Sequence, residues 1–481
     1  MISYSLVDFR PIIPELVLLF FTFFILFIDF AIPKAKKKVN GFIALIGVAV
    51  TLVVVLSLYG SSWTGFNNMI IFDKASGFVN IILLLTAFVA ILMSLDFIKR
   101  EGINFGEYYE ILLFSLIAMQ VFCSTYNLIV MFLAVETLSI AMYILTAIKR
   151  DGLRSTEAAM KYFILGSFAS SFLVLGIALI YGLFGTVDLL RVRELLAGAD
   201  SLHTWIALVS FVLILIGFGF KIAAFPFHAW TPDVYEGAIT PMSAFMSIAP
   251  KAASFMALMR LLVVGMFPIQ VEWVKLLWII AVFTMFFGNL VALWQKDLKR
   301  LLGYSSIAHA GYMLVGITAA NSLGYGAVLF YLFGYIFMNL GAFSVAEYIS
   351  KKNVEGCLID DLRGMGYKYP LAGAAMLIFM FSLSGVPPTV GFIGKYYLFS
   401  AAVKSHLYWL VILGVINSAI SAYFYLNVIV TMYMKGGAKE EVVSFPSPYL
   451  RAAIVIGAVG TIIFGVAPGS VLNVALSSIV F

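Results

Sequence analysis

Five ionisable residues of this sequence lie within long apolar stretches, where charge is expensive. They are Glu136, Lys221, Lys251, His309 and Lys395. An ionised lysine at the centre of a lipid bilayer costs roughly 2.5–3.5 kcal/mol on insertion scales, so such residues mark functional sites by default. A carboxylate, an imidazole and several amines are the groups that carry protons through a membrane. The chemistry that they predict is therefore proton movement.

The depth of these residues can be estimated from the sequence. Glu136, Lys221, Lys251 and His309 each lie about eight to ten residues from the nearest end of an apolar stretch. About ten helical residues cover half of a hydrocarbon core of roughly 30 Å. These four residues, on four different helices, are therefore predicted to lie near one plane. Lys395 lies further along its stretch, beyond the break "SGVPPTVG".

A row of this kind can move protons by simple electrostatics. Burial makes an amine release its proton more readily, and a nearby carboxylate opposes that tendency. A lysine whose glutamate partner can be drawn away therefore alternates between holding and releasing a proton, and a histidine can relay it near neutral pH. Water must fill the gaps, and the small and polar residues of "GSFASSF", "SSIAHAGY" and "INSAISAYFYLN" leave room for it.

Each residue also has a structural explanation. Lys161, about one turn into its stretch, could extend to the cytoplasmic surface. His309 could be a neutral histidine that packs between helices, and Glu136 could form a permanent ion pair with a lysine. Packing is achieved more cheaply by Leu or Met than by Lys221 or Lys251, so a functional role is favoured for these two. Three charges nearer to the ends of stretches are interpreted as interfacial: Glu15, Asp29 and Arg260.

The elements that must position these residues are membrane-spanning helices. Of the 481 residues, 63% are hydrophobic and 11% are charged, whereas a soluble domain carries about 25% charged residues. Apolar runs of about 20 residues recur from end to end, which predicts an all-α polytopic membrane protein with about 14 transmembrane helices. The predicted spans are 12–32, 41–60, 76–97, 108–125, 127–147, 157–184, 204–229, 240–265, 273–294, 301–319, 324–349, 370–398, 405–433 and 450–467.

The distribution of basic residues predicts the orientation. If Met1 lies outside, nineteen of the 30 Lys and Arg fall in cytoplasmic connections, among them "KAKKK", "IKR", "KRDGLR", "KDLKR", "SKKN…DLRGMGYK" and "MKGGAK". Six fall on the outer side and five within spans. The positive-inside rule therefore favours fourteen spans with both termini outside. The net charge of +6 is an orientation signal and does not indicate nucleic-acid binding.

Two of the predicted spans are interrupted. Pro226 lies within the seventh, and Gly385, Pro387, Pro388 and Gly391 lie within the twelfth. Broken helices at matching positions of two halves point to the ion path of inverted-repeat transporters. Spans 4–8 and 9–13 are therefore predicted to form two five-helix units, the second inverted because five is odd. The alternative is a pair of proline-kinked packing helices.

Other kinds of site find little support. Cys123 and Cys357 are far apart and outside any CxxC spacing, so neither a disulfide framework nor an iron–sulfur site is indicated. GxGxxG, Walker A and HExxH motifs are absent from the sequence. The chain is therefore expected to bind neither nucleotide nor metal.

Several motifs carry a specific family resemblance. "FKIAAFPFHAWTPDVYEGAITPMSAF" resembles the antiporter-like membrane subunits of respiratory complex I, NADH:quinone oxidoreductase. The form "TPDVYEGA", together with "YSSIAHAGYMLVG", "MFLAVETLSIAMYIL" and "SLSGVPPTVGFIGKYYLF", looks like subunit N within that family. The resemblance covers essentially the whole chain.

The resemblance implies a fourteen-helix fold with inverted five-helix repeats and roles for named residues. It implies a Glu–Lys pair at Glu136 and Lys221, a central lysine at Lys251 and a terminal lysine at Lys395. Protons would enter at Lys221, cross by Lys251 with His309, and exchange with the outer side at Lys395. Further positions that match functional positions of the family are Lys161, His228 and Tyr304. Pro226 and His228 would shape the cytoplasmic access.

The resemblance also implies partners and location. One proton-translocating transmembrane domain would span 1–481, with helices 1–3 within 1–107, the repeats at 108–265 and 273–433, and the last helix within 450–481. NADH, FMN, iron–sulfur clusters and quinone are expected in other subunits, with no cofactor on this chain. The expected partners are a neighbouring antiporter-like subunit, small membrane subunits, the lipid bilayer of the cell inner (cytoplasmic) membrane and protons, and no nucleic acid.

Three other functions remain open from the sequence. A subunit of a multi-subunit cation/proton antiporter would share the fold and the charged row without a redox partner. A related oxidoreductase could take electrons from ferredoxin, reduced deazaflavin or hydrogen. A free-standing transporter of an organic solute would instead need a polar and aromatic pocket with a mobile gate. The linear series of charges argues against that last function.

Overall fold

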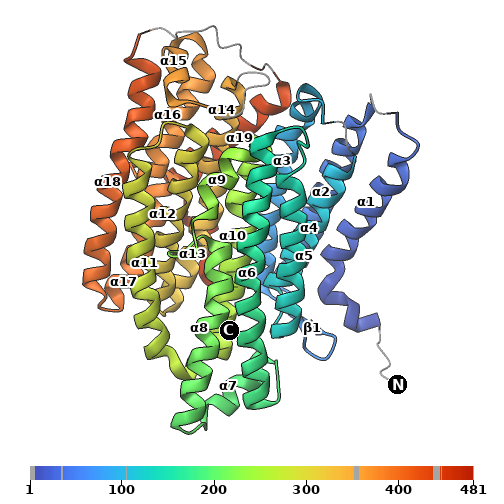
Figure 1. The fold of residues 1–481 in the computed structure, drawn as a ribbon, viewed down its shortest axis with the longest axis vertical. Coiled ribbons are helices and arrows are strands. Elements are labelled where there is room, and N and C mark those ends of the chain that lie inside the picture. Colours follow the sequence, from blue (N-terminus) through green and yellow to red (C-terminus); the bar gives the residue numbers. More distant parts are fainter. Residues whose placement is uncertain are drawn as a thin grey trace.

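The computed structural model describes residues 6–33, 36–103, 106–350, 357–436, 445 and 447–479, and almost all of these are helical. Some residues of the predicted cytoplasmic connections lie outside the described residues: Lys34, Lys351, Lys352 and Lys439. The strands of the described part are β1 (Trp63–Gly65) and β2 (Ile70–Phe72), which pair antiparallel. Figure 1 shows α15 at one end of the long helices and β1 and α7 at the other.

The N-terminal helices lie at one side of the molecule (Figure 1). A short 3₁₀ segment (Leu6–Ile12) leads into α1 (Ile13–Asp29), which is followed by α2 (Lys38–Leu58) and α3 (Lys74–Arg100). Asp73 caps α3 by accepting the backbone N–H of Ser76 at 2.8 Å. An oxygen-bearing side chain at this position satisfies a donor that the first helical turn leaves free.

The first predicted five-helix unit follows along the chain. Its helices are α4 (Glu107–Cys123), α5 (Leu128–Thr146), α6 (Leu153–Phe184), the short α7 (Leu189–Ala197), α8 (Ser201–Ile222), α9 (Trp230–Gly237) and α10 (Thr240–Arg260). A π-helical turn (Leu261–Gly265) and a 3₁₀ turn (Phe267–Ile269) end it. Every residue of α10 is buried, and the helix packs against α3, α4, α8 and α14, so it forms part of the core.

The second predicted unit and the C-terminal helices complete the chain. They are α11 (Gln270–Ala292), α12 (Leu298–Thr318), α13 (Ser322–Tyr335), a π-helical turn (Ile336–Leu340), α14 (Gly341–Ile349), a 3₁₀ turn (Ile359–Leu362), α15 (Met365–Lys368), α16 (Pro370–Ser384), α17 (Val390–Lys404), α18 (Tyr408–Tyr433), α19 (Pro448–Val466) and α20 (Gly469–Ser478). From α13 to α14 this region is almost wholly buried.

The predicted all-α membrane fold is confirmed, while the count of fourteen stays a prediction. Among the described residues, 11 helical segments are long and apolar enough to cross a membrane. The three other predicted spans correspond to α4, which has 17 residues, to α12, and to the broken pair α16 and α17. α12 carries the polar stretch "YSSIAHAGY", and each half of the broken pair is shorter than a bilayer needs.

Both predicted helix breaks are present, and the helix before each break ends in the same way. α8 ends at Ile222 with Ala223 in the left-handed conformation (φ 61°), and the N–H of Ala224 donates to the carbonyl of Gly219 at 2.8 Å. α16 ends with Gly385 in that conformation (φ 92°), and the next N–H again donates back five residues, at 2.9 Å. This pattern satisfies carbonyls at a helix end without continuing the helix.

The second helix of each unit begins in the same way. α5 begins after Asn127, which forms an isolated bridge with Asp188, and α12 begins after Asp297, which forms one with Leu358. In both bridges the partner lies 61 residues further along the chain. This matching topology supports the predicted repeat, whose boundaries stay a prediction.

The α16–α17 break leaves no room for a side chain at Gly391. A Cβ there would overlap the backbone carbonyl of Ser382, whose hydroxyl accepts the N–H of Gly391 at 3.1 Å. We expect Gly391→Ala to destabilise the protein by about 1–3 kcal/mol, as overpacked cores do. The melting temperature of the detergent-solubilised protein checks this. The matched control is Gly182→Ala on α6, where a Cβ meets nothing within 4 Å and the melting temperature should not fall.

Candidate functional site

Lys221 lies at the end of α8 in an aromatic enclosure. Its side chain is 4% exposed and its Nζ has no hydrogen-bond partner. The Nζ lies 5.4 to 5.7 Å from the ring centroids of Phe220, Tyr162 and Tyr143. Aromatic faces attract a cation without fixing it by a directed bond. An ammonium held this way keeps three unused N–H donors, so a proton can leave it without breaking a hydrogen bond.

Glu136 is held by a different helix. Its carboxylate accepts a short hydrogen bond from the hydroxyl of Ser170 on α6, and the residue is partly exposed on α5. Among the described residues, no ion pair joins Glu136 to Lys221. The pair implied by the family resemblance is therefore open in this structure, with Glu136 directed to Ser170.

Lys251 connects α10 to α12. Its Nζ donates to the backbone carbonyl of Ser306 at 2.7 Å and makes a short hydrogen bond to the Ser306 hydroxyl. The residue is 1% exposed. A charged donor that is buried needs such acceptors, because an unpaired buried charge costs several kcal/mol. Ser306 therefore positions the central lysine.

His309 lies between two tyrosine hydroxyls. Its Nδ1 lies 2.5 Å from the hydroxyl oxygen of Tyr331, and its Nε2 lies 3.0 Å from that of Tyr425. The Tyr425 hydroxyl in turn lies 2.5 Å from that of Ser305. A tyrosine hydroxyl can donate or accept, so both neutral tautomers of the imidazole can be satisfied here. This arrangement allows a proton to arrive at one ring nitrogen and leave from the other.

Lys395 lies on α17, next to the break that separates α17 from α16. Its Nζ donates to the carbonyls of Leu383 and Ser384 at 3.1 and 3.0 Å and to the Ser418 hydroxyl at 2.9 Å. The first two are free carbonyls at the C-terminus of α16, where the helix dipole favours a cation. All three N–H donors of the ammonium are thus used, in contrast to those of Lys221. Lys395 also lines a mainly apolar pocket of about 870 Å³ between α17 and α18.

Polar contacts connect the second half of the row. Tyr312 links its last two members, because its ring lies 5.7 Å from that of His309 and the Lys395 Nζ lies 4.7 Å from its centroid. The groups joined by contacts or by adjacency along α12 are, in order, Lys251, Ser306, Ser305, Tyr425, His309, Tyr312 and Lys395. The structure does not join Lys221 to this series by a hydrogen bond. The common depth of the row stays a prediction.

Lys161 lies in a surface cluster that includes residues missed by the sequence analysis. Its Nζ is 2.8 Å from a carboxylate oxygen of Asp233 and 2.7 Å from one of Glu157. The other oxygen of Asp233 accepts from Arg300 at 2.6 Å. These residues line a pocket of about 460 Å³. Asp233 is part of the quoted motif "TPDVYEGA". Its acidic side chain was the feature of the sequence that could have pointed to this cluster.

The remaining predicted residues lie apart from this series. His228 occupies the break between α8 and α9 and stacks on Phe225, with ring centroids 5.6 Å apart, and its Nδ1 has no hydrogen-bond partner. Pro226 is exposed in the same break. Tyr304 is partly buried on α12, and within the described part of the chain no hydrogen bond involves its hydroxyl.

Two residues of the His309 network were also missed. Tyr331 and Tyr425 lie 22 and 116 residues from His309. Tyr425 belongs to the quoted polar stretch "INSAISAYFYLN", which was interpreted as space for water. Tyr331 stands in an apolar run without a comparable signal.

Comparison with known proteins identifies the family. The family described as "NADH:quinone oxidoreductase/Mrp antiporter, TM" matches residues 125–421. NADH-quinone oxidoreductase subunit N of Trichlorobacter lovleyi is 43% identical over 99% of this chain and 98% of its own length.

Solved structures agree with this comparison. A chain of respiratory complex I from Thermus thermophilus with bound aureothin has a TM-score of 0.82 and 33% identity, covering 96% of this chain and 100% of its own. A chain of the Mrp complex from Dietzia sp. has a TM-score of 0.84 and 19% identity over 97% and 96%, which shows likeness of fold alone. The chain belongs to the subunit N branch of the NADH:quinone oxidoreductase/Mrp antiporter membrane family.

Proposed function

We propose that this chain is the proton-translocating, antiporter-like membrane subunit of an NADH:quinone oxidoreductase. The observation that carries the proposal is the series of buried groups from Lys251 through His309 to Lys395, joined by hydrogen bonds, by the adjacency of Ser305 and Ser306, and by ring contacts of Tyr312. Leucine would fill such positions more cheaply, and intramembrane ionisable groups facing the interior of a helix bundle serve ion paths. Near-full-length relatives carry the name of this subunit.

Each member of the row has one task in this proposal. Lys221 accepts a proton on the cytoplasmic side and releases it when Glu136, which accepts a hydrogen bond from Ser170, is drawn away from it. Lys251 receives that proton, and His309 relays it from the side of Tyr425 past Tyr312 toward Lys395. Lys395 holds it against the end of α16 and gives it to the outer side.

The surface residues supply protons to that row. The Lys161, Asp233 and Arg300 cluster lines a pocket on the face predicted to be cytoplasmic, and fixed charges there hold water and exchange protons. His228 and Pro226, in the nearby helix break, shape the passage inward. Tyr304, five residues before His309, is proposed to extend the path toward this face.

The redox chemistry belongs to other subunits in this proposal. NADH, FMN, iron–sulfur clusters and quinone bind elsewhere in the complex, and this chain carries no cofactor. Its partners are a neighbouring antiporter-like subunit and small membrane subunits of the same complex. The chain lies in the cell inner membrane with both termini outside, as its basic residues predict.

A cation/proton antiporter is the second candidate, because the matched family and the structural likeness include Mrp antiporters. Purification in mild detergent followed by native mass spectrometry and proteoliposome assays distinguishes the two. We expect an assembly that contains flavin and iron–sulfur clusters and pumps protons during NADH oxidation by quinone. Isolation only with other hydrophobic subunits, with sodium/proton exchange in the absence of NADH, would contradict the proposal.

A further inference from the structure

Glu347 is a buried acid that the proposed row does not use. It lies on α14 with 0% exposure, and neither carboxylate oxygen has a hydrogen-bond partner. An ionised carboxylate without a partner is costly in such a place. The charged groups whose electrostatic effect reaches it are Arg100, Lys299, Glu101 and Asp96. A structural role needs no acid here, because a hydrophobic residue of similar size fills buried space at lower cost.

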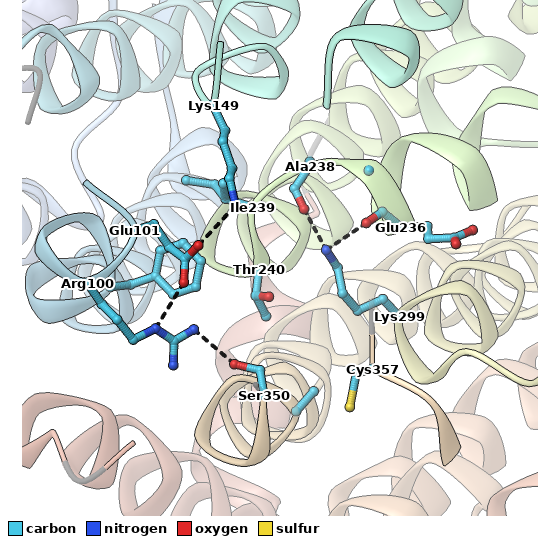
Figure 2. A pocket seen from close by; sticks show the side chains of 13 residues that line it. Arg100, Glu101, Lys149, Glu236, Ala238, Ile239, Thr240, Lys299, Ser350 and Cys357 are labelled. Carbon is cyan, nitrogen blue, oxygen red and sulfur yellow. Dashed lines mark hydrogen bonds and ion pairs between the residues drawn. The ribbon is translucent and has the colours of Figure 1, made fainter. Parts of the chain in front are cut away.

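Figure 2 shows a polar pocket that Glu347 does not itself line, although residues close to it in the chain do. It has a volume of about 550 Å³, and its lining residues include Ala346, which precedes Glu347 on α14, and Ser350, which follows the end of that helix. Arg100 and Lys299 reach it from opposite sides in Figure 2. The basic residues that line it belong to connections predicted to be cytoplasmic. The pocket therefore offers access from that face.

The cationic side chains that line this pocket form hydrogen bonds with groups other than Glu347. Arg100 donates to Glu101 at 3.1 Å and to the Ser350 hydroxyl at 3.0 Å. Lys299 donates to the carbonyls of Glu236 and Ala238 at 2.9 and 2.5 Å. They lie near Glu347 without forming an ion pair with it within the described part of the chain. Its carboxyl group can therefore gain or lose a proton while these contacts remain.

The π-helical turn before α14 contacts α10, the helix that carries Lys251. Ser344 lies one turn before Glu347, and Asn339 lies in the π-helical turn that precedes α14. The Asn339 amide donates to the Ser247 hydroxyl at 2.5 Å, and its Oδ1 has no partner. Ser247 is one helical turn before Lys251 on the same face of α10. π-Helical turns inside α-helices are frequent at functional sites.

We propose that Glu347 is a second proton-loading group, which takes protons from the pocket of Figure 2 and passes them to Lys251. The O–H bond of the protonated Glu347 breaks and an N–H bond forms on the neutral Lys251 amine. Water positioned by the side chains of Ser344, Asn339 and Ser247 carries the transfer. The carboxylate left behind takes a new proton from water in the pocket. This inference rests on the proposed function of Lys251.

The test compares Glu347→Gln with Glu347→Asp in the assembled complex. The readout is the number of protons pumped per NADH oxidised in inverted membrane vesicles, with the amount of assembled complex measured alongside. We expect Glu347→Gln to lower pumping about twofold, because the protons that enter at Lys221 still reach Lys251. Glu347→Asp keeps the acid and should retain most pumping. Normal pumping in Glu347→Gln, or equal loss in both variants, would overturn the inference.

Two further variants keep the test decisive. Ser247→Ala leaves Glu347 and the packing in place but removes the hydroxyl next to Asn339, so pumping should fall. Unchanged pumping in this variant would overturn the proposed route, even if the Glu347→Gln complex fails to assemble. The matched control is Glu15→Gln, which alters another buried glutamate without partners and should pump normally. Loss of pumping in Lys251→Ala with normal pumping in Glu347→Gln rejects this inference alone. Normal pumping in Lys251→Ala rejects the proposed function itself.

Discussion

Replacing Lys251 by alanine is expected to reduce proton pumping at least about a hundredfold, to the background of the assay, while the complex still assembles. Lys251 joins α10 to the series of groups on α12, because its Nζ binds the carbonyl and the hydroxyl of Ser306. Without the amine, no group on α10 can receive a proton and pass it to His309. Coupled NADH oxidation should slow as well, because electron transfer is tied to pumping.

The Lys251→Arg variant distinguishes a need for proton transfer at this position from a need for positive charge alone. Arginine keeps the positive charge but does not lose its proton in proteins, so pumping should stay at background. Pumping by the arginine variant would show that the charge alone matters at this position. The matched control is Lys275→Ala at an exposed ion pair, where the lysine side chain is 69% exposed and pumping should be unchanged. Dye quenching in inverted vesicles, normalised to assembled complex, measures all three variants.

Replacing Lys221 by methionine is expected to lower pumping at least about twofold without weakening the fold, because only the protons that Glu347 supplies then reach Lys251. Methionine has a similar length and fills the space between Phe220, Tyr162 and Tyr143. The substitution removes a buried amine that has no hydrogen-bond partner, so the melting temperature of the complex should stay the same or rise. Functional groups often lower stability in this way.

For Lys221→Met, pumping should therefore fall while the melting temperature does not. Pumping is measured in inverted vesicles and unfolding by differential scanning fluorimetry of the purified complex. Arg191→Ala, at an exposed ion pair on α7, serves as the control for both measurements. A lower melting temperature together with normal pumping would identify Lys221 as a structural residue and contradict its role in proton uptake.

Much of the fold followed from residue types and their order. Long apolar runs require helices, since a backbone in lipid must satisfy its own hydrogen bonds. The prolines at 226, 387 and 388 and the glycine at 385 predicted where helices must stop, and the structure ends α8 and α16 at those places. The count of spans was harder to verify, because α12 carries a polar stretch and the broken helices are short.

The candidate site could be predicted only in part. The charged row was visible because Lys221, Lys251 and Lys395 are rare residues for their surroundings. Its partners were not visible, because serine, tyrosine and asparagine are common in apolar helices and carry no comparable signal. Tyr331 is one example, and Ser306 another. Glu347 is acidic and buried, but near the end of its predicted span it resembles an interfacial residue in sequence.

The sequence by itself determined the helical membrane fold, the two breaks and which ionisable groups lie within apolar stretches, since cost in lipid and helix-breaking geometry depend on local residue types. Only the tertiary structure decided which groups meet. Lys251 and Ser306 are 55 residues apart, and His309 and Tyr425 are 116 apart. Such contacts depend on how helices rotate and pack against one another. Packing is set by many side chains together, so no single motif encodes it.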